Sequence, residues 1–116
     1  MAEIKRGDIW IVNLDPTIGH EIKKSRPAVI IQNDIGNKYS PLTIIAPITS
    51  QNLEKIYPIE VLLNTKNSSV EIDSKVLLNQ IRSIDKERLI KKVGKVNEET
   101  LSDINEALKI SLDLMW

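Results

Sequence analysis

The chain has 116 residues, of which 41% are hydrophobic and 28% charged, and its 16 basic residues equal its 16 acidic ones. This length predicts one domain spanning residues 1–116. The high hydrophobic fraction and the net charge of zero exclude a disordered chain. The sequence has no cysteine and one histidine, which excludes disulfides, thiolate metal sites and a pair of histidines within one chain. The longest apolar runs are four residues, and the first residues lack the apolar stretch of a secretory signal. We therefore expect a cytoplasmic protein that does not enter a membrane.

Two regimes follow one another along the chain, with short strands up to about residue 96 and one helix after it. Short apolar and β-branched runs bounded by turn residues predict strands at residues 8–14, 26–32, 42–48, 59–63, 74–84 and, weakly, 93–96. Residues 33–41 are rich in turn formers and predict a loop, and residues 85–89 predict a single capped turn.

The last segment, residues 98–116, predicts a helix with Asn97 as its N-cap. One apolar stripe recurs at helical spacing, formed by Leu101, Ile104, Leu108, Leu112 and Met115. The residues that widen this stripe are Ala107, Ile110 and Leu114. So wide a stripe favours a partner surface. The whole pattern predicts an α+β, mainly β fold, in which a small twisted barrel or curled sheet carries a C-terminal helix.

Local charge is patterned although the net charge is zero. Residues 86–95 contain five basic residues and one acidic residue, and Lys23, Lys24 and Arg26 form a second basic cluster. Such clusters are either solvated faces or sites that hold a phosphate backbone.

The residues that could carry chemistry are few. No spacing typical of a metal-ligand set, a phosphate loop or a serine nucleophile elbow occurs. Arg26 opens a strand, where its guanidinium can face a phosphate or pair with Glu21 or Asp15. Thr49 closes another strand and fits either a turn residue or a catalytic group, and the loop position of His20 favours a surface residue.

A series of short motifs covers nearly the whole chain in a fixed order. They are KRGDIWIVNLDPTIGHE at residues 5–21, SRPAVI at 25–30, QNDIGN at 32–37, APITSQ at 46–51 and LNQIRSIDKERL at 78–89. Together they resemble the MazF/PemK family of toxin endoribonucleases. The resemblance implies an SH3-like (plasmid-maintenance-toxin) barrel with a C-terminal helix. It also implies a sequence-specific ribonuclease that cuts single-stranded RNA without a metal or other cofactor, and that inhibits translation and growth.

The resemblance assigns roles to individual residues. Arg26 matches the catalytic arginine of the R-P motif, Thr49 the catalytic threonine, and Glu21 an acidic position that supports them. The residues implied to bind RNA are Gly19, His20, Lys23, Lys24 and Gln80. Residues 22–25 depart from the family by carrying Ile-Lys-Lys-Ser where small residues are common, and the two added cations favour a phosphate chain. His20 occupies a position where relatives can carry serine, which argues against an essential base.

The implied partners are single-stranded RNA, a second copy of the chain, and a cognate antitoxin whose disordered acidic tail occupies the RNA groove. Without a metal, the RNA's own 2′-hydroxyl attacks the adjacent phosphorus, so a 2′,3′-cyclic phosphate and a 5′-hydroxyl are the expected products. Two alternatives remain open. One is a gyrase-binding toxin of the CcdB type, in which a C-terminal aromatic, here Trp116, contacts the topoisomerase. The other is a catalytically inactive RNA-binding relative.

Overall fold

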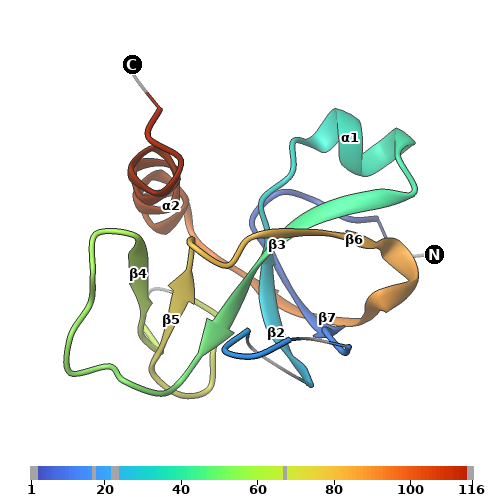
Figure 1. Ribbon diagram of the computed structural model, residues 1–116. Coiled ribbons are helices and arrows are strands. Elements are labelled where there is room, and N and C mark those ends of the chain that lie inside the picture. Colours follow the sequence, from blue (N-terminus) through green and yellow to red (C-terminus); the bar gives the residue numbers. More distant parts are fainter. Residues whose placement is uncertain (1–2, 17, 22–23, 67, 115–116) are drawn as a thin grey trace.

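The structure is a computed structural model that describes residues 3–16, 18–21, 24–66 and 68–114. Its elements, in chain order, are β1 (Asp8–Asn13), β2 (Ser25–Ile30), α1 (Asp34–Tyr39), β3 (Leu42–Thr49), β4 (Glu60–Leu63), β5 (Ser74–Leu77), β6 (Arg82–Asp85), the 3-10 turn η1 (Lys86–Arg88), β7 (Leu89–Lys95) and α2 (Glu98–Ser111). The 7-stranded antiparallel sheet has the order β4-β5-β3-β2-β1-β7, and β6 pairs with β3 (Figure 1). The predicted α+β class with a C-terminal helix is confirmed.

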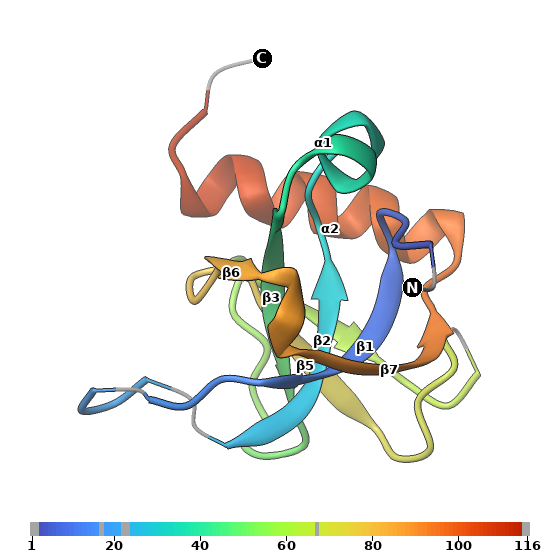
Figure 2. The same ribbon diagram turned by 90° about the vertical axis from the view of Figure 1, so that its right-hand side faces the viewer.

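The sheet carries an apolar core on each face, because successive side chains of a strand point to opposite faces. In β1, Ile9 belongs to one core, and Trp10 and Val12 belong to the other. The core of Ile9 also takes Ile104 and Ala107 from α2, so this helix covers one face of the sheet (Figure 2).

The sheet is curled and incompletely closed, with β4 and β7 as its edges. The segment after β4 reaches the end of β7, where Ser68 and Val96 form an isolated bridge. The hydroxyl of Ser69 donates to the carbonyl of Lys95 at 3.1 Å and accepts its N–H at 3.3 Å. These contacts bring the two edges together and give the sheet its barrel-like shape.

Strand β7 is longer than the predicted strand at residues 93–96, and it runs through Gly94 rather than breaking there. The glycine is required by the approach of the neighbouring segment, since a Cβ at position 94 would lie 2.2 Å from the Cβ of Ser69. From sequence, Gly94 was expected to interrupt the strand, but it marks a close packing contact inside it.

The predicted strand at residues 74–84 is in fact two strands, β5 and β6. Both pair with the same strand, because Ile48 and Thr49 of β3 face β5 whereas its residues 42–45 face β6. A turn must therefore interrupt the run, and the N–H of Gln80 bonds to the carbonyl of Leu77 at 3.2 Å.

The predicted loop at residues 33–41 contains a short helix, α1, so that prediction was wrong. The side chain of Asn33 caps the helix, and Asn37, within the helix, is buried. Asn37 donates to the carbonyl of Gln32 at 2.9 Å and accepts the hydroxyl of Thr43 at 2.7 Å. Tertiary hydrogen bonds thus make a helix from residues that are individually turn formers.

Helix α2 begins after Asn97, whose side chain accepts the N–H of Thr100 at 2.8 Å, as predicted. It ends at Ser111, short of the predicted residue 116, because Asp113 adopts a φ of 55° and Leu114 N–H bonds to the Lys109 carbonyl at 2.8 Å, a Schellman-type ending. The apolar side chains packed in or against the core are Leu101, Ile104, Ala107 and Leu108. Those left about half exposed are Ile110, Leu112 and Leu114. Met115 and Trp116 lie outside the described residues.

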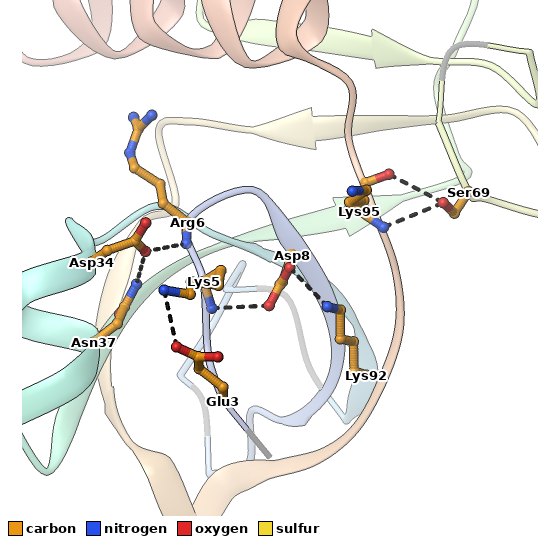
Figure 3. A network of polar contacts seen from close by, with 9 residues as sticks. All are labelled: Glu3, Lys5, Arg6, Asp8, Asp34, Asn37, Ser69, Lys92 and Lys95. Carbon is orange, nitrogen blue, oxygen red and sulfur yellow. Dashed lines mark hydrogen bonds and ion pairs between the residues drawn. The ribbon is translucent and has the colours of Figure 1, made fainter.

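The Arg-Gly-Asp motif near the start of the chain is a structural junction. The Arg6 guanidinium donates to the carbonyl of Ile31 at 2.9 Å and to the side chain of Asn105 at 2.6 Å, which ties β1 to the end of β2 and to α2. The backbone N–H of Arg6 donates to Asp34 at 2.6 Å, and this bond lowers the pKa of the Asp34 carboxyl (Figure 3). The buried carboxylate of Asp8 accepts the N–H of Lys5 at 2.9 Å.

A buried ion pair holds the long connection between β3 and β4. The Lys75 side chain is 5% exposed and that of Glu60 is 9% exposed, and their charged atoms lie 2.9 Å apart. The Lys75 ammonium also donates to the carbonyls of Asn52 at 2.9 Å and Lys55 at 3.4 Å. Nothing in the local sequence marked these two residues as a pair.

We predict that Glu60→Ala destabilises the protein by about 3–5 kcal/mol, because it leaves the Lys75 ammonium buried without its counter-charge. Urea denaturation measures the loss. The double variant Glu60→Leu/Lys75→Met should cost much less, since removing both charges removes the desolvation penalty as well. If Glu60→Ala and the double variant were equally unstable, the ion pair would not be the cause.

Candidate functional site

Arg26 and Thr49 lie at the same end of two neighbouring strands. The register of β2 and β3 pairs Ala28 with Pro47, and continuing it by two residues places Arg26 opposite Thr49. The paired residues of β2 and β3 end at Pro47, and pairing with β5 begins at Ile48. The Ile31 N–H bonds to the Ile44 carbonyl, so the odd-numbered residues of β2 turn their backbone groups toward β3. Pro27, the next such residue facing Ile48, has no N–H with which to continue the ladder, so the strands are free to separate at this point.

A groove of about 520 Å³ opens there, and both Arg26 and Thr49 line it. Its apolar lining residues are Ile9, Ile11, Pro27, Ile48, Val70, Ile72 and Val93. Its other polar lining residues are Ser50, Gln51, Ser69, Glu71, Ser74 and Lys91. The groove thus combines an apolar surface with two cations, Arg26 and Lys91, and one carboxylate, Glu71.

The Thr49 hydroxyl is oriented by its own turn. Its Oγ1 accepts the backbone N–H of Gln51 at 3.2 Å. A hydroxyl has one donor and two acceptor positions, so this bond leaves the hydroxyl proton for a ligand in the groove. The half-buried Arg26 carries five N–H donors in a planar array suited to phosphate oxygens. Together they can bind and stabilise a phosphoryl group.

Three of the other predicted site residues lie around a second pocket of about 420 Å³. His20 and Glu21 line it from the connection between β1 and β2, and Gln80 lines it from the turn between β5 and β6. The Glu21 carboxylate accepts the N–H of Ile18 at 2.5 Å, while the Glu21 N–H donates to the Ile18 carbonyl at 3.2 Å. Glu21 therefore closes a turn of its own loop, and it does not line the groove of Arg26 and Thr49.

The base of this loop is held by two arginines. Arg82 donates to the carbonyl of Leu14 at 3.1 Å, and Arg88 donates to the carbonyl of Asn13 at 3.1 Å and to that of Asp15. These contacts fix where the loop leaves β1. From sequence, both arginines were expected to supply cations to a binding partner. Their contacts with the loop could not be predicted, because these join residues more than 60 positions apart.

The remaining predicted residues are less informative. Gly19 has a φ of 60° and Lys24 a φ of 68°, so both adopt left-handed backbone conformations in the loop. Lys24 is exposed, and neither residue lines the two pockets. Lys23 lies outside the described residues.

Within the described part of the chain, no three histidine, cysteine, aspartate or glutamate side chains come together in a way that could hold a metal ion. No helix among those residues is long and apolar enough to cross a membrane.

Comparison with known proteins gives a consistent picture. Residues 5–112 match the family described as the PemK-like, MazF-like toxin of type II toxin–antitoxin systems. The chain belongs to this family. Among its relatives, endoribonuclease EndoA of Bacillus subtilis is 44% identical over 112 residues, covering 97% of both chains. Endoribonuclease MazF9 of Mycobacterium tuberculosis is 40% identical over 116 residues, covering 96% of this chain and 98% of the relative.

Solved structures agree on the fold of this MazF-like chain. MazF from Deinococcus radiodurans superposes with a TM-score of 0.83 at 25% identity, covering 97% of this chain and 99% of that one. A mycobacterial endoribonuclease in complex with its cognate antitoxin gives a TM-score of 0.80 at 22% identity, over 97% of this chain and 98% of that one. The predicted toxin fold is confirmed, and none of these comparisons points to the CcdB-type alternative.

Proposed function

We propose that this chain is the endoribonuclease toxin of a toxin–antitoxin pair, and that it cuts single-stranded RNA in the groove lined by Arg26 and Thr49. The observation that carries the proposal is the convergence of these two side chains, which the motifs had singled out separately, on one groove. The relatives named endoribonucleases, at 40–44% identity over nearly the full chain, support the same activity.

The mechanism needs no metal. The ribose 2′-hydroxyl attacks the adjacent phosphorus, so a 2′-O–P bond forms and the P–O5′ bond breaks. The 2′-hydroxyl loses its proton, the 5′-oxygen gains one, and the products are a 2′,3′-cyclic phosphate and a 5′-hydroxyl. Arg26 stabilises the negative charge that builds up on the phosphoryl oxygens, and Thr49 donates a hydrogen bond to a non-bridging oxygen.

Glu21 supports this chemistry from a distance. Its bond to Ile18 N–H shapes the loop that, with Gln80, borders the second pocket. His20, Gly19, Lys23 and Lys24 belong to the same loop, which we assign to the RNA chain flanking the cut. DNA lacks the 2′-hydroxyl, and pairing hides base edges in duplex RNA, so neither is a substrate.

We predict that the purified protein cleaves single-stranded RNA in EDTA and leaves DNA and duplex RNA intact, as seen by gel electrophoresis. Arg26→Ala should lower the rate by about 100- to 1,000-fold, the cost of losing a donor to a developing oxyanion. Arg26→Lys should restore little, since an ammonium lacks the planar array of donors. A requirement for Mg²⁺, or an Arg26→Ala protein with half the rate, would rule out this mechanism.

Four further variants complete the series. Thr49→Ala should lose most activity and Thr49→Ser much less, because serine keeps the hydroxyl. His20→Ser should be tolerated. Glu21→Gln should retain most activity, since the glutamine amide oxygen can still accept the Ile18 N–H. A large loss of activity in this variant would indicate that Glu21 accepts the 2′-hydroxyl proton.

The proposed active form is a homodimer. The apolar residues at the end of α2 support this, because Ile110, Leu112 and Leu114 are 50%, 50% and 49% exposed and lie close together in sequence. A contiguous apolar patch is a liability on a monomer.

We predict a dimer by light scattering at micromolar concentration. The double variant Leu112→Lys/Leu114→Lys should shift the protein toward monomer, because the two lysines place charges in the proposed dimer interface. A wild-type monomer at this concentration would contradict the proposal.

The same groove is the proposed binding site of an antitoxin that blocks the ribonuclease. An antitoxin tail that is acidic and apolar would place its carboxylates on Arg26 and Lys91 and its apolar side chains on the isoleucines beneath. A disordered segment gives up part of its contact energy on ordering but can cover a large surface.

We predict that antitoxin and RNA exclude one another. Antitoxin titrated into a complex of Arg26→Ala protein and fluorescent RNA should release the RNA, and both ligands should bind more weakly as salt rises. A ternary complex that keeps its RNA would refute control by occupation of the groove.

A further inference from the structure

Neighbouring lysines of β7 point to opposite faces of the sheet. In the register with β1, Lys91 pairs with Ile11 and Lys92 pairs with Trp10. Ile11 lines the groove of Arg26, whereas Trp10 is buried in the core on the other face. Lys92 pairs with the buried Asp8 at 3.2 Å (Figure 3). Lys91 itself lines the groove, and no carboxylate among the described residues forms an ion pair with it.

Lys91 stands at one end of an apolar row that leads to Pro27, the chain neighbour of Arg26. Ile11 pairs with Lys91 on one side and with Pro27 on the other, so the row Lys91–Ile11–Pro27 crosses three strands. Adjacent strands are about 4.8 Å apart, which places the Cα atoms of Lys91 and Pro27 roughly 10 Å from one another. Arg26 stands next to Pro27, and the exposed side chain of Val93 also borders the groove.

The backbone of β7 is irregular on both sides of these lysines. The register with β1 shifts between Ile9 and Trp10 and again between Ile11 and Val12. Such irregularities re-aim side chains and are frequent next to active sites. Here the two register shifts lie on either side of the pairs Ile11–Lys91 and Trp10–Lys92, in which Lys91 faces the groove and Lys92 the opposite face.

From this geometry we propose that Lys91 is a second RNA-binding cation, which holds a phosphate next to the one at Arg26. The proposal rests on the proposed ribonuclease function and extends the RNA path across β1 onto β7. Single-stranded RNA presents a negative phosphate at every nucleotide and an apolar face on every base, and the row of Ile11 and Pro27 between the cations suits the base. The Glu71 carboxylate on the same groove opposes this attraction and limits it.

The test is RNA binding as a function of salt, measured by fluorescence anisotropy. The probe is a labelled single-stranded RNA of random sequence with 2′-O-methyl groups, which cannot be cleaved. Lys91→Met should weaken binding several-fold at low salt and reduce the slope of log K against log salt by about 0.7, the value for one phosphate contact on a single strand. Lys91→Arg should restore both. Glu71→Gln should tighten binding at low salt.

Lys92→Met is the matched control, since it removes the same charge one residue away on the other face. Thermal unfolding should first establish that this variant is folded, because it unpairs the buried Asp8. Its salt slope should equal that of the wild type, and an equal reduction in both variants would overturn the proposal. The proposal is also overturned if Lys91→Met keeps the wild-type salt slope while the wild type still cleaves RNA in EDTA. A wild type that neither binds nor cleaves RNA would overturn the ribonuclease function and this proposal together.

Discussion

Strand β3 is hydrogen-bonded to three other strands, and the groove lies where its pairing changes. Ile45 faces β2 on one side and β6 on the other, whereas Thr49 faces Lys75 of β5. Pairing with β2 ends at Pro47 and pairing with β5 begins at Ile48, so β3 changes neighbours between Ile45 and Thr49. Because Arg26 stands at the corresponding end of β2, the place where the two strands part is also where Arg26 and Thr49 line one opening.

The same strand links the groove to the interior of the protein. Lys75, the register partner of Thr49, is the buried cation that holds the segment after Thr49 through the carbonyls of Asn52 and Lys55. An ion pair that removes two charges from water contributes little net stability. Its contribution here is positional, because it fixes the direction in which the chain leaves Thr49, the threonine of the proposed site.

Much of this fold could be predicted from local pattern. The apolar run that forms β1 and the Asn97 cap of α2 depend on neighbouring residues, and both predictions were confirmed. The features that were missed depend on contacts between distant residues. Asn37 makes a helix from turn formers by bonding to the strand that follows, and Gly94 continues a strand because Ser69 packs against it.

In the candidate site, too, some features could be predicted from the sequence and others depend on contacts between distant residues. The motifs identified Arg26 and Thr49, and the structure brings them to one groove. The family resemblance grouped Glu21 with them, whereas its carboxylate accepts the Ile18 N–H within its own loop. Lys91 could not be separated from Lys92 by sequence, since two adjacent lysines look alike until the register with β1 is known.

The lysines of β7 have one more consequence, for how copies of this protein meet. Strand β7 is an edge of the sheet, and an edge offers unpaired backbone groups to any passing strand. Charged side chains along such an edge discourage a second strand from adding to it, and β7 carries Lys91, Lys92 and Lys95. The lysines therefore disfavour the pairing of a strand from a second molecule with β7, the edge strand that lines the groove. In the proposed dimer, self-association falls to the apolar end of α2, and the approach to Arg26 along β7 stays open to the proposed RNA path.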